Sequence, residues 1–233
     1  VGGIMQYNEV TNTRRQPDNG DATAFDFDFN CFECVVQYNV SRENDGGLLL
    51  IMHTARNNVA RYNLCQNDRR LLYLQCTLDE ANLVHNNVFY MDRGPADLVL
   101  TWWGQDRRDG MGAVLKNNIF YATGQGRFGV LYMTGLKDGV FQGDRDPANP
   151  GTFENNCYFG PWEGARPQDP KSLVADPLFV APGTGGEGLA AWQGYRLRPE
   201  SPCLGAGVLI PDTGGRDFGG RPLPHGKPDL GAW

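Results

Sequence analysis

Hydrophobic and polar positions recur along this chain as one unit: a short apolar segment, an Asn, and a second short apolar segment. The unit occurs as IMQYNEV at 4–10, VVQYNVS at 35–41, VARYNLC at 59–65, LVHNNVF at 83–89, VLKNNIF at 114–120 and TFENNCY at 152–158. The anchoring residues are Asn8, Asn39, Asn63, Asn87, Asn118 and Asn156, at spacings of 31, 24, 24, 31 and 38 residues. A strand-rich repeat of about two dozen residues is typical of a solenoid. The pattern therefore predicts one elongated repeat domain.

Longer apolar segments lie between the Asn-centred units, so each repeat offers about three short strands. They read AFDFDF at 24–29, LLLIMH at 48–53, LLYLQC at 71–76, LVLTWW at 98–103 and GVLYMT at 129–134. β-branched and aromatic residues dominate them and the chain has 31 Gly, which disfavours the alternative of a helical solenoid. Three stacked strands per coil predict an all-β parallel β-helix. We expect each Asn to occupy a corner, where it accepts a left-handed backbone and hydrogen-bonds its counterpart in the next coil.

The strand at 24–29 singles out two carboxylates. Phe25, Phe27 and Phe29 alternate with Asp26 and Asp28, so a period of two puts the rings on one side and the carboxylates on the other. We expect the rings to face inward, because the reverse would bury two unpaired charges. Neighbouring carboxylates repel each other, which raises the pKa of one of them and suits a general acid. Asp26 and Asp28 are therefore candidate catalytic residues, and a merely solvated strand face is the alternative.

His53 is a third catalytic candidate, as a base or a sugar ligand, because the segment 48–53 follows the Asp pair in the next coil. The parity that keeps His53 out of the core also exposes Leu49 and Ile51. This expectation is tested by the burial of those two side chains.

Later coils add polar and aromatic side chains to the same strip. Tyr73 and Gln75 face outward if their apolar neighbours in the segment 71–76 pack inward, and one of Trp102 and Trp103 must also face out. Aromatic faces stack on sugar rings, while carboxylates bind hydroxyl groups or act as acid and base. These four residues are therefore candidate substrate-binding residues in a carbohydrate groove.

Two loops supply further candidates. Glu43 and Asp45 lie in the turn SRENDGG at 41–47, where they could bind sugar hydroxyls, although turn formation explains this sequence equally well. Arg107 and Arg108 lie in the loop GQDRRDG at 104–110, which could overhang the groove and bind a substrate carboxylate. A self-neutralising surface loop is the alternative for this second segment.

We predict no metal ion and no other cofactor. Calcium held by Asp144, Asp146 and Asn149 is the alternative, but this loop lacks the Gly and the distant Glu of an EF-hand. Six Cys residues include one C-x2-C pair, Cys31 and Cys34, without a second pair at zinc spacing. We expect most of them to be buried thiols, with a Cys31–Cys34 disulfide as the alternative.

Composition limits the partners. The formal net charge of -6 is spread along the chain, so no basic stripe is available for nucleic acid, and no run of 18 apolar residues predicts a membrane span. The chain opens on Val1 within a strand segment, and we expect it to be a processed or truncated piece whose earlier coils are missing.

The Asn-anchored coils over residues 4–160 resemble those of right-handed parallel β-helix proteins of the pectate-lyase-like superfamily. The tail motifs are similar to the closing coil of secreted bacterial members: DPLFVAPG at 176–183, YRLRPESPCLGAG at 195–207, GRDFGGRPLP at 215–224 and PDLGAW at 228–233. The resemblance implies coils of about 24 residues over 1–175, a closing coil and tail of the same domain over 176–233, and a location outside the cytoplasm. Members include lyases, glycoside hydrolases, epimerases and proteins without a known reaction, so the fold does not choose among them.

Two classes of function remain open. The Asp pair favours a carbohydrate-active enzyme that hydrolyses the glycosidic bond of a polysaccharide or oligosaccharide, rather than a lyase that eliminates at a uronic acid. The scarcity of Lys supports this preference, although His53, Tyr73 and Arg107 could serve a lyase. A non-catalytic β-helix that binds glycans or acts as an adhesin is the second class.

Overall fold

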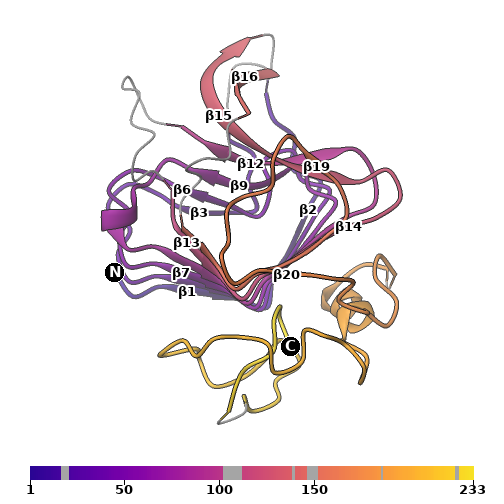
Figure 1. Ribbon diagram of the computed structural model, residues 1–233. Helices are drawn as coiled ribbons and strands as arrows, with labels where there is room; N and C mark the ends of the chain where they lie inside the picture. Colours follow the sequence, from indigo (N-terminus) through magenta and orange to yellow (C-terminus); the bar gives the residue numbers. More distant parts are fainter. Residues whose placement is uncertain (17–20, 102–111, 138–139, 146–151, 185, 224–225) are drawn as a thin grey trace.

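The computed structural model describes residues 1–16, 21–101, 112–137, 140–145, 152–184, 186–223 and 226–233, and over these residues the chain is mostly β. The strands form three sheets, which we name A, B and C (Figure 1). Sheet A contains β1 (Ile4–Gln6), β4 (Val35–Gln37), β7 (Val59–Arg61), β10 (Leu83–His85), β13 (Val114–Lys116) and β17 (Thr152–Glu154). Sheet B contains β2 (Glu9–Thr11), β5 (Val40–Arg42), β8 (Leu64–Gln66), β11 (Val88–Met91), β14 (Ile119–Ala122), β18 (Cys157–Phe159) and β20 (Leu173–Val174). Sheet C contains β3 (Phe25–Phe27), β6 (Leu49–Ile51), β9 (Arg70–Leu74), β12 (Pro95–Leu100), β15 (Arg127–Lys137) and β16 (Val140–Asp144).

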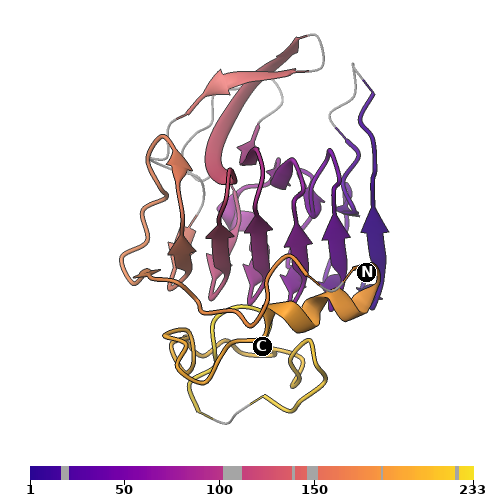
Figure 2. The same cartoon turned by 90° about the vertical axis from the view of Figure 1, so that its right-hand side faces the viewer.

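The order of pairing shows how the chain travels. From β1 to β12, each strand pairs in parallel with the strand three places later, so the chain visits the three sheets in turn and then starts the next layer. Figure 2 shows the strands of one side stacked next to one another along the molecule. Parallel sheets were predicted and are confirmed, and this topology is compatible with a parallel β-helix. An antiparallel hairpin of β15 and β16 extends sheet C, and the short strand β19 (Trp162–Glu163) also pairs with β15.

The predicted asparagines form a continuous ladder. The backbone nitrogen and Nδ2 of Asn39 both donate to Oδ1 of Asn63, at 3.1 and 3.0 Å, and Asn63 donates in the same way to Asn87 at 2.9 Å. Equivalent pairs extend the ladder to Asn8 at one end and Asn156 at the other. The ladder residues from Asn39 to Asn156 are fully buried, so each hydrogen bond replaces water that is absent there.

The prediction that these asparagines adopt a left-handed backbone is wrong. The residue before each one does so instead, as Tyr38 (φ 55), Tyr62 (φ 50) and Asn86 (φ 51) illustrate. The preceding residue makes the bend at the corner, so the backbone nitrogen and Nδ2 of the ladder asparagine both point at the next layer. Tyr and Asn therefore tolerate the strained backbone at this corner, while the ladder position itself needs the amide side chain.

Apolar side chains from all three sheets fill the interior. Phe25 and Phe27 on β3 pack there as predicted, in register with Leu49 and Ile51 on β6. The expectation that Leu49 and Ile51 are exposed is therefore wrong. His53 lies beyond the end of β6, in a turn where the Ala55 backbone donates to the Met52 carbonyl oxygen. The alternation of inward and outward side chains stops before this turn. The position of His53 therefore does not indicate which side chains of β6 face the core.

Phe29 also departs from prediction, because its side chain is 51% exposed. Strand β3 ends at Phe27, and the Asp28 carboxylate then accepts a hydrogen bond from the Phe29 backbone at 2.7 Å. Asn30 follows with a positive φ of 59°, so the chain has left the strand before the third ring is reached.

All six cysteines are free thiols, and all except Cys31 are buried, as predicted for most of them. Two short 3-10 helices are present among the described residues, Leu78–Glu80 and Leu189–Tyr195, and no described helix is long and apolar enough to cross a membrane.

The C-terminal segment, residues 176–233, packs along the corner between sheets A and B. Asn86 and Asn117 donate from Nδ2 to the carbonyl oxygens of Gly231 (3.1 Å) and Val208 (2.8 Å), and the Tyr38 hydroxyl donates to that of Arg216 (2.9 Å). Figure 1 shows this segment, coloured orange to yellow, on the side of the stack away from β3, β6, β9 and β12. The division of the chain at residue 175 stays a prediction.

Candidate functional site

The outer face of sheet C carries the candidate site. Asp26 lies on β3 between the inward-facing Phe25 and Phe27, so its side chain points outward and is exposed. The register of the sheet aligns Asp26 with Leu50 of β6, and Leu50 with Tyr73 of β9. Alternation along β3 therefore positions the carboxylate, and the ordered stacking of layers places it beside residues far away in sequence.

The rest of that row is apolar. Leu50, Tyr73 and Val99 are buried and pack together as a small cluster of their own, with Met52 and Met133 beside them. In this row, Asp26 is thus the only charged residue among those that the structure describes.

Asp21 and Asp28 lie close enough to Asp26 at this end of the sheet to repel its carboxylate, and we call these three residues the carboxylate cluster. Although Asp26 is exposed, partial burial of its carboxyl group and then repulsion from Asp28 and Asp21 raise its pKa from 3.8 to about 7. Asp26 is consequently protonated in part at neutral pH. It can give up a proton at a pH where an ordinary aspartate has none to give.

Arg70 lies next to the carboxylate cluster. Its side chain is buried, and Nη2 donates to the carbonyl oxygen of Asp21 at 2.8 Å, while its guanidinium lies 4.8 Å from the centre of the Tyr73 ring. Burial lowers the pKa of Arg70 to about 10, so it keeps its positive charge at neutral pH. The buried Arg70 cation, held between the Asp21 carbonyl oxygen and the Tyr73 ring, fixes the backbone that carries Asp21.

Sequence reasoning missed Asp21 and Arg70. Arg70 is a charged residue at the start of the otherwise apolar strand Arg70–Leu74, and this departure from the pattern is the signal that could have drawn attention to it. Asp21 precedes β3 in a segment where apolar and polar residues do not alternate, so the sequence does not indicate which way its side chain points.

Tyr73 and Gln75 alternate with core residues as predicted, but they are not exposed. Leu72, Leu74 and Cys76 pack in the interior, whereas only 4% of Tyr73 and 3% of Gln75 is accessible. The Tyr73 hydroxyl donates to Sδ of Met133 at 3.8 Å, so packing on the outer face covers it. These two side chains support the wall of the site and have little surface to offer a ligand.

His53 is held by a different partner. Nδ1 of His53 lies 3.2 Å from Oε1 of Glu80, a buried carboxylate that also accepts hydrogen bonds from the backbone of Thr54 (2.6 Å) and Thr77 (2.9 Å). This network ties the turn after β6 to the 3-10 helix Leu78–Glu80. His53 is half-exposed, and its catalytic role stays a prediction.

Glu43 and Asp45 occupy the same turn but face different neighbours. Glu43 accepts a hydrogen bond from Nη2 of Arg93 at 2.6 Å. Asp45 accepts one from the Arg15 backbone at 3.1 Å, and its own carbonyl oxygen lies 3.4 Å from Nε of Arg70. Asp45 is therefore linked to the candidate site through Arg70.

Several predicted residues lie outside the part of the chain that the structure describes: Trp102, Trp103, Arg107, Arg108, Asp146 and Asn149. Asp144 is described and exposed. Within the described ranges, no group of three or more His, Cys, Asp and Glu side chains is arranged to hold a metal ion.

No family model matches the chain. It is 29% identical over 252 residues to lacto-N-biosidase of Bifidobacterium longum subsp. longum, a glycoside hydrolase. The match covers 98% of this chain and 14% of that protein, so the chain spans a small part of the relative's length. The likeness supports a carbohydrate-active protein.

Proposed function

We propose that this protein hydrolyses a glycosidic bond in an oligosaccharide or polysaccharide, with the carboxylate cluster as its catalytic centre. The observation that carries the proposal is the outward-facing Asp26 on β3, with the carboxylates of Asp28 and Asp21 near enough to repel it. Similarity to a lacto-N-biosidase over nearly the whole chain supports the same reaction class. The fold that goes with this proposal is a right-handed parallel β-helix built on a basic coil of about 24 residues.

Glycoside hydrolysis needs one protonated and one ionised carboxyl group. Asp26, whose pKa is about 7, is suited to protonate the oxygen of the leaving sugar as the bond from carbon to that oxygen breaks. In one route, the ionised carboxylate of Asp28 or Asp21 attacks the sugar carbon as that bond breaks, and water then hydrolyses the ester formed between sugar and enzyme. In the other route, the same carboxylate removes a proton from the water that attacks the sugar carbon. Both arrangements end with one water molecule added across the bond.

The neighbouring residues contribute positioning. Arg70 holds the backbone at Asp21 and Asp45, and Tyr73 packs against the Arg70 guanidinium. In this proposal, Glu43, Asp45 and the loop containing Trp102, Trp103, Arg107 and Arg108 bind the sugars that flank the cleaved bond. The name of the relative makes oligosaccharides that contain lacto-N-biose the first substrates to test. We also propose that the protein acts outside the cytoplasm, where such glycans are met.

The test is a screen of the protein against neutral and acidic oligosaccharides, following both new reducing ends and unsaturated uronic acids. We expect new reducing ends without unsaturated products. Asp26→Asn should abolish turnover and keep glycan binding, because the side chain keeps its size and loses its proton. Glu200→Gln, which changes an exposed carboxylate in the C-terminal segment, is the matched control.

The other outcomes identify the other functions. Unsaturated uronic acids would show a lyase and overturn the hydrolase proposal. Glycan binding without turnover, unchanged in Asp26→Asn, would indicate a binding module and remove the carboxylate cluster from consideration.

A further inference from the structure

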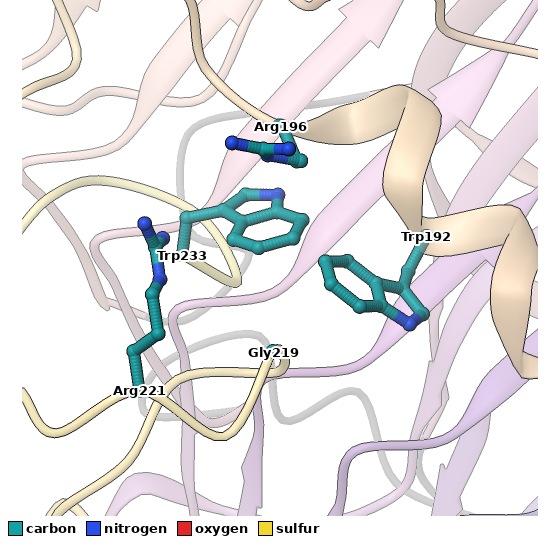
Figure 3. A pocket seen from close by; sticks show the side chains of 5 residues that line it. All are labelled: Trp192, Arg196, Gly219, Arg221 and Trp233. Atoms are coloured by element: carbon teal, nitrogen blue, oxygen red, sulfur yellow. The ribbon is translucent and has the colours of Figure 1, made fainter.

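A second site lies in the C-terminal segment. Trp192, Arg196, Gly219, Arg221 and Trp233 line a pocket with a volume of about 230 Å³ (Figure 3). The segment that carries it packs on the side of the stack away from β3, β6 and β9 (Figure 1). The pocket is therefore separate from the carboxylate cluster and has no part in the proposed hydrolysis.

Three pieces of chain build the pocket. Trp192 lies on the 3-10 helix Leu189–Tyr195. Gly219 belongs to a turn closed by the Gly220 backbone, which donates to Asp217 at 3.0 Å, and Trp233 follows Ala232 beside that turn. The Phe218 backbone donates to Ala232 at 2.9 Å, which fixes that turn against the last residues. Such a frame presents its side chains in set positions.

The Trp233 ring lies between Trp192 and two guanidinium groups. The ring centres of Trp192 and Trp233 lie 4.3 Å apart at an angle of 45°, and the guanidinium carbons of Arg221 and Arg196 lie 5.2 and 6.0 Å from the Trp233 ring. Figure 3 shows Arg196 above the Trp233 indole and Trp192 to one side of it. Trp233 is buried, whereas Trp192 is half-exposed and keeps ring surface for a ligand.

Gly219 keeps the indoles accessible. A Cβ at this position would lie 3.0 Å from Cζ3 of Trp233 and 3.2 Å from Cη2 of Trp192, so a side chain here would close the space between them. The position does not have the positive φ that would itself demand glycine. The pocket therefore depends on the absence of a side chain at residue 219.

The two arginines differ in charge balance. Arg221 is paired with Asp217, with Nε and Oδ2 2.8 Å apart, and is largely neutralised. Arg196 is exposed and forms no ion pair with a carboxylate among the residues that the structure describes. The pocket consequently has one uncompensated guanidinium, whose planar N–H groups match a carboxylate in bidentate fashion.

We propose that this pocket binds one carboxylate-bearing sugar residue, with the carboxylate on Arg196 and the ring on Trp192. The volume is below the roughly 300–1,000 Å³ of pockets for drug-sized ligands, which fits a single ring rather than a longer chain. Indole rings stack on the apolar face of a sugar, and the guanidinium selects the acidic one. The pocket would hold an acidic sugar of a glycan while the carboxylate cluster, on the other side of the stack, acts on a glycosidic bond.

Ligand-detected NMR titration of the whole chain tests this, with glucuronic acid, N-acetylneuraminic acid, glucose and acetate as probes. We expect one of the two acidic sugars to bind at least about tenfold more tightly than glucose or acetate. The acidic sugar that binds shows whether the pocket recognises the carboxylate of a uronic acid or that of a sialic acid.

Arg196→Gln should reduce acidic-sugar binding to the level of glucose, and Gly219→Leu should abolish binding by filling the pocket. Because Arg196 is exposed, Arg196→Gln should have the melting temperature of the unmodified protein. This variant therefore tests the proposal even if Gly219→Leu fails to fold. Asp26→Asn should bind the acidic sugar as the unmodified protein does, so failure of the hydrolase proposal leaves this result unaffected. Equal binding of glucose or acetate, or unchanged binding in Arg196→Gln, would overturn the proposal.

Discussion

The carboxylate of Asp169 takes the place of an asparagine at the end of the ladder that begins at Asn8. Its Oδ2 accepts hydrogen bonds from both the backbone nitrogen and Nδ2 of Asn156, each at 2.9 Å, which is the geometry that each ladder residue offers its neighbour. Oδ1 also accepts from the Asn155 backbone at 2.8 Å. One side chain therefore satisfies the last donors of a buried ladder.

Asp169→Ala should lower the free energy of unfolding by roughly 3 kcal/mol, since it leaves several partly buried donors without their acceptor. Asp169→Asn keeps one acceptor oxygen and should cost less than half as much. Urea denaturation of the two variants measures this difference. Equal stability of both variants and the unmodified protein would show that the ladder needs no terminal acceptor.

Position within the ladder should set the cost of losing an asparagine. Asn63 is fully buried, and Asn63→Ala leaves the buried backbone nitrogen of Asn39 without an acceptor and removes the bonds that Asn63 Nδ2 donates to Val36 and Asn87, so we expect a loss of roughly 3 kcal/mol. Asn8 also donates to Asn39 but is exposed, so water can replace its side-chain hydrogen bonds, and Asn8→Ala should cost less than about 1 kcal/mol. Denaturation midpoints compare the two, and a similar loss in both would contradict the role of burial.

Asp68 should make stability depend on pH. It is buried, and desolvation raises its pKa from 3.8 to about 7, while the Ser41 hydroxyl donates to it and the Asn44 backbone donates at 2.8 Å. The folded state therefore holds a proton that the unfolded state releases between about pH 4 and pH 7, so its contribution to stability falls as pH rises through that window.

Asp68→Asn should remove this dependence, because an amide keeps an acceptor for Asn44 and carries no charge. Relative to the unmodified protein, the variant should gain stability as pH rises from about 4 to about 7, by at most about 4 kcal/mol at roughly 1.4 kcal/mol for each pKa unit. Urea titrations across this range measure the gain. A constant difference between the two proteins at every pH would contradict a protonated Asp68.

The pKa of Asp26 should respond to its neighbours. Repulsion from Asp28 and Asp21 contributes to its raised value, so Asp21→Asn should shift the pKa of Asp26 downward without removing the larger effect of burial. Carboxyl-carbon NMR titration of the variant measures this. Glu200→Gln is the control that should leave the Asp26 titration where it was, and an unshifted pKa in Asp21→Asn would place Asp21 away from Asp26.

The stacking of layers could be predicted from sequence because its determinants are local and repeated. Each ladder asparagine lies between two short strands, and the alternation of Phe25, Asp26 and Phe27 assigns the carboxylate its direction. Parity failed at Leu49 and Ile51 because it was counted from His53, which lies in a turn beyond the strand.

Contacts between distant segments could not be predicted in this way. Asp21 and Arg70 are 49 residues apart, and their contact depends on the lengths of the turns between layers. Tyr73 was correctly assigned to the outer face, but its burial follows from packing against Leu50, Val99 and Met133, which no period within one strand reveals. The pocket at Trp192 and Trp233 likewise forms from pieces of the tail that lack any repeat.

The pH dependence of kcat/KM for hydrolysis of the best oligosaccharide from the screen tests the role of Asp26 most directly. If Asp26 donates the proton, kcat/KM should fall about tenfold per pH unit above about pH 7, as that carboxyl group loses its proton. A profile without an alkaline limb near pH 7, or full activity of Asp26→Asn throughout, would contradict it.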